Sequence, residues 1–404
     1  MKKIYMIILM VFVSVGLAAQ VNWAKHDQPV LPQGGAGSWD ESLLCPSVLK
    51  LGDTYHMWYT GINASQSMKI GYATSMDGII WDKYEDNPVL GPGPAGSFDE
   101  NRTYLPIVVY DDSIFHMYYV GAKNDENEYL FYATSEDGTT WTKHEAPEFQ
   151  QENGDPYGGH VNRGDVYYDG EVFHMWAGMT SRGLYDVGYA TSADGAIWTV
   201  VDPTVIYAPL SGEWDDPRIQ VATVFEMGDM YHMWYSGGDL FSWDIGYMHS
   251  PDGLNWTKHE ANPVLTRGEP GTWDAAFVAF PTIMYDPSDF ILKMWYSGSS
   301  ESVGGIGYAE QSFVSGLPGF ELPSDSKDGD LVLYPNPART YFIVETGKEE
   351  PGSVEILSMN GQVLYTETLK GGTRPIDVSG IPRGLYIVKV TIKSEFLTRK
   401  LVIE

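Results

Sequence analysis

The chain has 404 residues and carries 54 Asp and Glu against 25 Lys and Arg, which gives a formal net charge of −29 at pH 7. A surface of this sign repels phosphate backbones and anionic lipid headgroups, so the composition argues against nucleic acid and membrane partners and leaves neutral glycans and cations. Cys45 is the sole cysteine, so no internal disulfide forms and stability must come from the core, to which 27 Tyr and 13 Trp contribute.

Residues 1–20 have the order of a secretory signal peptide. Two lysines precede an apolar run from Ile4 to Leu17, and the small residues Ala18 and Ala19 follow it. The run is too short for a good membrane span, and no later segment is apolar for long enough. We therefore expect a protein that crosses the periplasm, has no membrane span, and is secreted or held at the cell surface.

One aromatic unit recurs along residues 21–312. It contains a His-Met-Trp-like strand, a Gly-Tyr-Ala-like strand and then, in four copies, the turn Ser-x-Asp-Gly-x-x-Trp. The turn glycines are spaced by 60, 57 and 58 residues, which is enough for four strands and sizeable loops. Asp-Gly suits a tight turn, and the Trp can pack between sheets, so a structural role is predicted for this motif. The five strand copies begin at His56, His116, His174, His232 and Lys293.

The fifth copy breaks off after Ala309, and its missing part lies at the other end of the chain. The segment WAKHDQPVL at 23–31 nearly repeats WTKHEANPVL at 256–265. An N-terminal strand that starts at Trp23 can complete the fifth sheet, because a ring of sheets closes well when the first and last parts of a chain share one blade. The predicted fold is all-β, a closed five-bladed β-propeller over residues 21–312.

A second domain follows a linker. Residues 313–330 are rich in Gly, Pro, Ser and Asp, as expected of a linker, whereas residues 331–404 contain short strand patterns and an Asn360-Gly361 hairpin turn, which predict a small β-sandwich. The segment 331–404 has nine Lys and Arg and eight Asp and Glu, so residues 1–330 carry a net charge of −30.

The tail, with LYPNP at 333–337, VEILSMNGQVLY, GLYIVKV at 384–390 and a terminal RKLVIE, resembles the C-terminal sorting domain of the type IX secretion system of Bacteroidetes. The resemblance implies recognition by that secretion machinery, export across the outer membrane and then removal of the tail, with release or surface attachment. The alternative is an immunoglobulin-like accessory module, for which the C-terminus would stay intact.

The repeats HMWYTG, IGYATS, DGxxW and NPVL resemble the five-bladed superfamily that contains glycoside hydrolase families 43 and 32 and the mannoside phosphorylases of family 130. Family 43 enzymes place an Asp before the first-blade proline, a second Asp in the next blade and a Glu in the third. This chain has Cys45-Pro46, Leu105-Pro106 and Asn162-Arg163-Gly164 there, and the family 32 motifs are also absent. Catalytic residues of these families therefore do not carry over.

Residues that differ among blades, near the start of each innermost strand, are the candidate site. Asp40, Asp99, Asp215 and Asp274 recur in four blades, which favours a structural turn role. Alternation along a strand would send Arg102 and Tyr104 to the side of Glu100, and Arg218 and Gln220 to the side of Asp216. We expect Glu100 and Asp216 to serve as acid and base, with Glu41 and Asp165 as further carboxyl candidates. The predicted sugar-binding residues are Arg102, Tyr104, His160, Asn162, Arg163, Arg218, Gln220 and Trp243. Trp243 belongs with Tyr185 and Phe241 to the aromatic residues between the second and third strands of their units, which are candidates for stacking on sugar rings.

Three functions follow from this pattern. The leading hypothesis is a secreted glycoside hydrolase that acts on a polysaccharide or oligosaccharide. The second is a noncatalytic glycan-binding or surface propeller that has lost the family acids. The charged groups at the mouth can equally be ion pairs that close the rim. The third is a glycoside phosphorylase in which arginines hold phosphate. No cofactor is expected, and a Ca²⁺ in the central channel stays open, since acidic residues are plentiful but form no EF-hand pattern.

Overall fold

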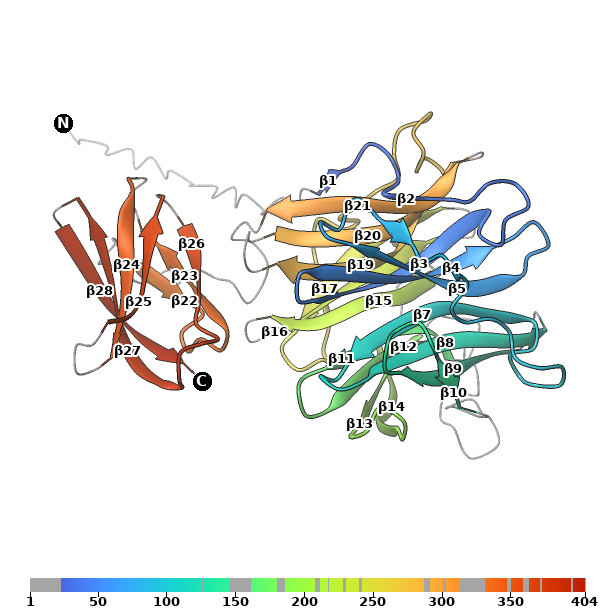
Figure 1. The fold of residues 1–404 in the computed structure, drawn as a ribbon, viewed down its shortest axis with the longest axis horizontal. Coiled ribbons are helices and arrows are strands. Elements are labelled where there is room, and N and C mark those ends of the chain that lie inside the picture. Colours follow the sequence, from blue (N-terminus) through green and yellow to red (C-terminus); the bar gives the residue numbers. More distant parts are fainter. Residues whose placement is uncertain are drawn as a thin grey trace, which may run out of the picture.

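The computed structural model describes residues 23–124, 127–144, 161–179, 186–207, 211–216, 218–227, 230–239, 242–286, 291–300, 303–312, 331–346, 350–358, 363–370, 373–393 and 395–403. Every regular element in these ranges is a β-strand (Figure 1). Across the same ranges, no helix is long and apolar enough to span a bilayer.

Strands within each of the sequence copies, which we name units 1 to 5, pair antiparallel, and the parallel pairing Met68↔Arg102 joins units 1 and 2 into one eight-stranded sheet. Unit 1 contains β3 (Ser42–Leu51), β4 (Thr54–Ile62), β5 (Met68–Ser75) and β6 (Asp82–Lys83), and unit 2 contains β7 (Arg102–Tyr110), β8 (Phe115–Asn124), β9 (Asn127–Ser135) and β10 (Thr142–Lys143). Unit 3 contains β11 (Val161–Tyr168), β12 (Phe173–Met179), β13 (Asp186–Ser192) and β14 (Thr199–Tyr207), and unit 4 contains β15 (Arg218–Met227), β16 (Met230–Gly238), β17 (Trp243–Ser250) and β18 (Thr257–Lys258). Unit 5 contains β19 (Phe277–Asp286), β20 (Ile291–Ser299) and β21 (Gly304–Ser312).

The N-terminal segment completes the sheet of unit 5. Strand β1 (Ala24–Lys25) pairs with β21 in the register Ala24↔Glu310, and β2 (Leu31–Pro32) pairs with the same strand. The Lys25 ammonium lies 2.7 Å from the Asp274 carboxylate and donates to the carbonyl of Thr266. The predicted pairing of the two chain ends within one sheet is therefore confirmed.

The Ser-x-Asp-Gly-x-x-Trp turns have the structural role that their sequence predicts. In unit 1, the Asp77 carboxylate accepts hydrogen bonds from the Ile79 and Ile80 amides at 2.8 Å, and these bonds hold its pKa below the usual range. Gly78 has φ +78°, and a Cβ there would lie 2.8 Å from the ring of Trp295. The turn thus needs glycine for both its backbone angle and its close contact with unit 5.

Contacts between units follow a cyclic order, with unit 5 against unit 1. The central aromatic residue of the His-Met-Trp strand donates a hydrogen bond to the turn-glycine carbonyl of another unit. The same position in unit 4, Trp234, has an indole N–H without a hydrogen-bond partner in the described residues, and unit 5 has no Asp-Gly turn there. The four bonds are Trp58 to Gly138 (2.8 Å), Tyr118 to Gly195 (2.6 Å), Trp176 to Gly253 (2.8 Å) and Trp295 to Gly78 (2.7 Å).

The recurring histidines pair with tyrosines on the neighbouring strand. In four units a ring nitrogen Nδ1 lies 2.6 Å from a tyrosine hydroxyl, as for His232 and Tyr247. His232 is buried, and this burial lowers its pKa from 6.5 to about 4. These histidines therefore serve the packing of each sheet.

The pKa of His232 makes stability depend on pH. The unfolded chain binds a proton at this ring near pH 6.5, whereas the folded chain binds it only near pH 4, so acidification across this window favours the unfolded state. We expect the free energy of unfolding to fall by about 3 kcal/mol from this group between pH 6.5 and 4, measured by urea unfolding at several pH values. His232→Phe should flatten this fall, and a variant as steep as the wild type would contradict the assignment.

The tail forms two sheets that share one hydrophobic core. The first contains β22 (Val332–Tyr334), β23 (Tyr341–Glu345) and β26 (Thr373–Asp377). The second contains β25 (Val363–Leu369), β24 (Gly352–Ser358), β27 (Gly384–Ile392) and β28 (Glu395–Ile403). Phe342 and Val344 of the first sheet lie in the same buried cluster as Val354 and Val388 of the second. In Figure 1 the first sheet lies on the side of the tail that is nearer to units 1 to 5.

Candidate functional site

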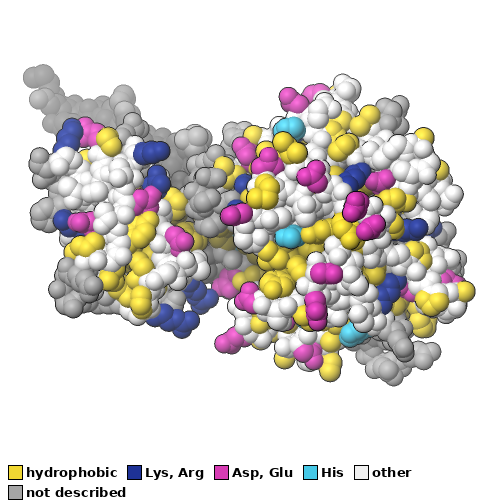
Figure 2. All heavy atoms as spheres, in the orientation of Figure 1, with side chains coloured by type: hydrophobic (Ala, Val, Ile, Leu, Met, Phe, Trp, Pro, Cys, Tyr) yellow, Lys and Arg dark blue, Asp and Glu magenta, His cyan; other side chains and the backbone are white. Residues whose placement is uncertain are grey.

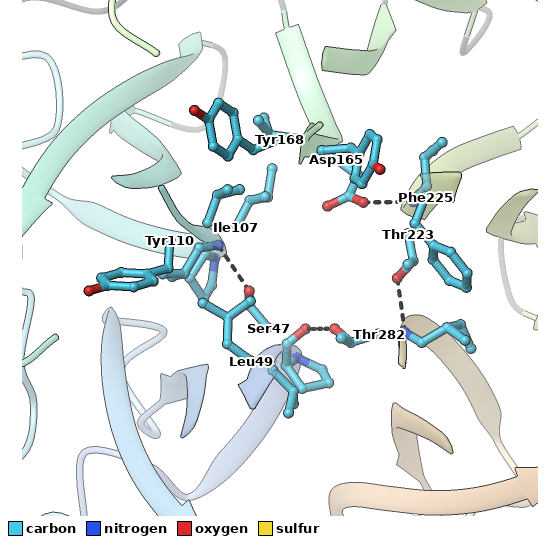
Figure 3. A pocket seen from close by; sticks show the side chains of 18 of the residues that line it. Ser47, Leu49, Ile107, Tyr110, Asp165, Tyr168, Thr223, Phe225 and Thr282 are labelled. Carbon is cyan, nitrogen blue, oxygen red and sulfur yellow. Dashed lines mark hydrogen bonds between the residues drawn. The ribbon is translucent and has the colours of Figure 1, made fainter. Parts of the chain in front are cut away.

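The first strands of all units surround a central cavity of about 320 Å³. β3, β7, β11, β15 and β19 each contribute lining residues (Figure 3). We call the end of the cavity where these strands begin the entrance end, and the end where they finish the exit end. Of the predicted site residues, Asp165 lines the cavity, whereas Arg102, Tyr104, Arg218 and Gln220 precede the lining residues of their strands and so lie beyond them at the entrance end.

One residue from each first strand stands at the same level of the cavity, opposite the central aromatic residue of the neighbouring strand. The Thr282 hydroxyl of unit 5 donates to the Pro46 carbonyl of unit 1 at 2.6 Å, and the Thr223 hydroxyl donates to the Pro281 carbonyl at 2.8 Å. Side chains at this level therefore join one first strand to another. The five residues are Ser47, Ile107, Asp165, Thr223 and Thr282.

Asp165 is the charged member of this level. Its carboxylate accepts a hydrogen bond from the Val224 amide at 2.6 Å, and Figure 3 shows it beside the open centre of the cavity. A carboxylate that reaches into a cavity is a candidate for both proton transfer and sugar binding. Asp165, which the sequence predicts to belong to the site, thus lines the central cavity. Its chemical role stays a prediction.

The first strands are bulged on the entrance side of this level. Cys45, Leu105 and Phe280 precede prolines and have φ values of 55°, 56° and 55°, which are strained for residues with side chains. Their amides donate to hydroxyls of the adjacent unit: Cys45 to Ser297, Leu105 to Thr60 and Phe280 to Ser236. The position at which family 43 enzymes carry an acid is therefore a buried thiol here.

Four aspartates at the start of the units tie the first strand to the outermost strand. Asp215, which is fully buried, lies 2.8 Å from the Lys258 ammonium and accepts from the Tyr235 hydroxyl at 3.0 Å. Such buried, paired carboxylates serve structure, as the repeat pattern predicts. The matching ion pairs are Lys83–Asp40 (2.6 Å), Lys143–Asp99 (2.6 Å) and Lys25–Asp274 (2.7 Å).

Unit 3 departs from this arrangement. Where other units have the tyrosine and the lysine of the contact, unit 3 has Ala177 and Val200. The position that supplies the hydroxyl acceptor for a bulge amide, as Thr60 does in unit 1, holds Gly178 in unit 3. Unit 2 also lacks this hydroxyl, because Val120 stands there. Unit 3 therefore lacks the entrance-end contacts that the other units repeat. A repeat without these structural contacts is free to carry a separate function at this end.

The predicted acid Glu100 and base Asp216 make the same kind of loop contact as Glu41. Glu41, Glu100 and Asp216 each accept a hydrogen bond from the amide of a glycine four residues earlier in the same loop, which for Asp216 is Gly212 at 2.9 Å. Glu100 also lies 3.8 Å from the Lys123 ammonium. Because the contact repeats, it favours a loop-stabilising role for all three, and their proposed catalytic role stays a prediction.

Arg102 and Tyr104 lie together at the entrance end of β7. The Tyr104 hydroxyl donates to the Glu128 carboxylate, and the pKa of Tyr104 is raised mainly by burial and next by Glu128, with Arg102 opposing the rise. Cys45 is close enough to influence the same hydroxyl. The predicted alternation along β7 is consistent with this cluster, whereas Glu128 was not predicted, because it lies on β9 and outside the repeated motifs.

Arg218, Gln220 and Trp243 form a second cluster, between units 4 and 5. The Arg218 guanidinium carbon lies 5.9 Å from the centre of the Trp243 ring, and this ring lies 6.0 Å from that of Phe280. The Gln220 side-chain oxygen is buried and has no hydrogen-bond partner in the described part of the chain. A buried acceptor without a partner is costly, so a ligand donor at this point would be favourable.

The remaining predicted residues of unit 3 and the loops are not placed. His160, Tyr185 and Phe241 lie outside the described residues, as do the side chains of Asn162 and Arg163. Among the described residues, no group of three or more His, Cys, Asp and Glu is arranged to hold a metal ion.

The tail matches a known family model. Residues 332–404 match the secretion system C-terminal sorting domain. The tail is a type IX sorting domain. It directs secretion, so the protein is secreted or carried to the cell surface, as the sequence predicts. The match gives the type IX machinery as a partner of this segment.

The first part of the repeat domain matches a glycoside hydrolase family model, and the chain has two uncharacterized curated relatives. Residues 18–165 match the model of the glycosyl hydrolases family 32 N-terminal domain. Two curated relatives, the uncharacterized proteins MT1551 and Rv1502 of Mycobacterium tuberculosis strains CDC 1551 / Oshkosh and H37Rv, are each 29% identical over 224 residues, which is 52% of this chain and 72% of the relative.

Solved structures show the same fold. A glycosyl hydrolase from Bacteroides ovatus has a TM-score of 0.56 at 18% identity over 72% of this chain and 92% of that chain. A structure of family 130, which is described as mannoside phosphorylases that include hydrolases of β-1,2-mannosidic linkages in Candida mannan, has a TM-score of 0.58 at 18% identity, covering 71% and 93%. A thermostable family 43 glycoside hydrolase has a TM-score of 0.53 at 17% identity, covering 71% and 94%. The fold is that of glycoside hydrolase propellers.

Proposed function

We propose that this secreted, carbohydrate-active protein binds a glycan at the entrance end of its central cavity. The observation that carries the proposal is the Gln220 oxygen, which is buried and has no hydrogen-bond partner among the described residues, on the same strand as Arg218, whose guanidinium lies over the Trp243 ring. An aromatic face suits the apolar face of a sugar, while an arginine and an amide oxygen bind its hydroxyls. Arg102 and Tyr104, on another first strand, supply further polar groups at the same end of the cavity.

We infer that units 1 to 5 form a closed five-bladed β-propeller over residues 21–312. The hydrogen bonds from Trp295 to Gly78 and from Thr282 to Pro46, together with the pairing of β1 and β21, support closure. Residues 1–20 are the proposed signal peptide, 313–330 the linker and 331–404 a β-sandwich. In such a ring the first strands converge on one channel, which is where propellers of this kind bind ligands.

Gln220→Leu tests the proposed site. Leucine removes a buried acceptor that no described residue satisfies, so we expect unchanged or higher thermal stability together with about 10-fold weaker glycan binding. Calorimetric titration of the exported chain with arabinan, xylan, fructan and mannan fragments would measure both polymer preference and affinity. A variant that loses stability but keeps its affinity would contradict the proposed role of Gln220.

Hydrolysis is the second candidate function, favoured by the carboxylates at the entrance end and by Asp165 in the cavity. The hypothesis keeps Glu100 and Asp216 as acid and base. Glu100→Gln is a sharp test, because glutamine can still accept the Gly96 amide bond but cannot transfer a proton. We expect sugar release, if hydrolysis occurs, to fall about 10² to 10⁴-fold.

Glu41→Gln is the matched control, because Glu41 makes the same loop contact in unit 1. With Glu100 and Asp216 as acid and base it should leave sugar release unchanged, and a loss of release would instead make Glu41, the further carboxyl candidate, the acid. Equal turnover in Glu100→Gln and wild type would exclude Glu100 as the acid. Release that requires inorganic phosphate would instead favour the phosphorylase alternative, in which an arginine such as Arg102 or Arg218 holds phosphate.

A further inference from the structure

The sorting domain contacts the exit end of the repeat domain. Tyr285, near the end of β19, has its ring centre 5.5 Å from that of Tyr341 in β23, with 44° between the ring planes. Tyr334 of β22 packs against the hydrophobic cluster that contains Met227, at the end of β15. Two tyrosines of the tail therefore pack against the repeat domain, and one of them, Tyr341, does so near the end of a first strand.

The exit end of the cavity is lined by aromatic and aliphatic side chains. Leu49, Tyr110, Tyr168 and Phe225 surround it in Figure 3. Phe225 belongs to the group that packs around the same cluster as Tyr334. Tyr167 is another lining residue. Burial raises its pKa, and the positive charge of Arg339 opposes this rise. Arg339 thus approaches the exit end from the tail.

The charges of the two domains suit this contact. Residues 1–330 carry a net charge of −30, whereas residues 331–404 carry +1. Figure 2 shows Lys and Arg side chains on the edge of the tail next to units 1 to 5, where Asp and Glu side chains lie across from them. Within-chain contacts of this kind are weak interfaces that a linker supports by raising the effective concentration of the two surfaces.

We propose that the sorting domain docks on the exit end through Tyr334, Arg339 and Tyr341, covers the aromatic mouth formed by Phe225 and Tyr285 while the linker is intact, and leaves it when the linker is cut. The occupant of this surface is thus the tail itself. The sorting domain has a second role in this arrangement, because the exit end of the channel is shielded until the tail is removed.

Small-angle scattering of the intact chain tests the docked state. Tyr285→Ala removes the ring that Tyr341 contacts, and Arg339→Glu reverses an exposed charge without a change in any core. We expect each variant to raise the radius of gyration relative to wild type, and the double variant to raise it further. Tyr129→Ala is the matched control, since Tyr129 is a partly buried tyrosine that packs against Phe98 in the loop before β7. A wild-type chain as extended as the double variant would overturn the docking.

A protease site inserted within residues 313–330 tests release. After the linker is cut in the otherwise intact protein, we expect the tail and the repeat domain to separate on size-exclusion chromatography. Separation at low as well as moderate salt supports release by loss of the linker. Co-elution of the two parts after cutting would overturn it, because the interface would then be strong enough to persist without covalent attachment.

Discussion

Trp243→Ala should weaken glycan binding by about 30-fold, the effect of losing about 2 kcal/mol at a central aromatic contact. The indole ring forms one wall of the entrance cluster, where it packs against Phe280 and lies beneath the Arg218 guanidinium. Alanine removes the flat surface on which a sugar ring would rest and also frees Arg218 from its cation–π contact. Titration calorimetry with the best glycan of the panel would measure the change.

Trp243→Phe is the control for this substitution. Phenylalanine keeps an aromatic face against Phe280 and Arg218, so most of the affinity should remain. The melting temperature of each variant separates a binding defect from unfolding. Wild-type affinity in Trp243→Ala, with the fold intact, would place the sugar elsewhere on the protein.

Trp295→Ala should lower the free energy of unfolding by about 3 to 5 kcal/mol, as expected for the loss of a fully buried Trp side chain. Its indole N–H donates to the Gly78 carbonyl, so this residue of unit 5 also holds the turn of unit 1. The cost therefore includes both a cavity and the loss of one of the two hydrogen bonds that the Gly78 carbonyl accepts, the other of which comes from the Trp81 indole at 2.9 Å. Urea unfolding followed by circular dichroism would measure it.

A pair of Trp→Phe variants isolates the bond between units 5 and 1. Trp234 occupies the equivalent place in unit 4, is equally buried, and has no hydrogen-bond partner among the described residues. Trp295→Phe should cost about 1 kcal/mol more than Trp234→Phe, since only the former removes a hydrogen bond. Equal costs would argue against a role for the Trp295–Gly78 bond in closing the ring.

The repeats made much of the fold predictable. A copy that lacked its last strand, together with a matching segment at the N-terminus, predicted the pairing of β1 with β21. The Ser-x-Asp-Gly-x-x-Trp pattern predicted turns, since Asp77 and its equivalents bond the amides that follow them. These features are local in sequence, or repeated, and both kinds of signal are visible in a single chain.

The site was less predictable, because its contacts join side chains on different strands that the repeated motifs do not mark. The sequence grouped Arg218 with Gln220 by alternation, but it did not show that the Gln220 oxygen would be buried with no partner in the described ranges. Glu128 was missed because nothing in the repeat pattern marks a residue at the start of β9 as a neighbour of Tyr104. The spacing of residues around the candidate acids did contain one further signal of their contacts.

That signal is a glycine four residues before each candidate acid. Gly37 precedes Glu41, Gly96 precedes Glu100, and Gly212 precedes Asp216 by the same spacing, which is the geometry of a loop closed by a carboxylate. Unit 5 has the corresponding Gly271 but Ala275 in place of the acid. The variation among units that favoured catalysis at these positions is thus also explained by the loss of a loop contact in one unit.

The most direct test of the account is a binding titration of the exported wild-type chain and of Arg218→Met with arabinan, xylan, fructan and mannan fragments. Methionine keeps the apolar stem over Trp243 but removes the charge and the donors. The account predicts saturable binding of wild type to at least one polymer and a loss of at least about 10-fold in the variant. Absence of binding to every polymer, or affinity that is the same in Arg218→Met, would contradict a glycan site at the entrance end.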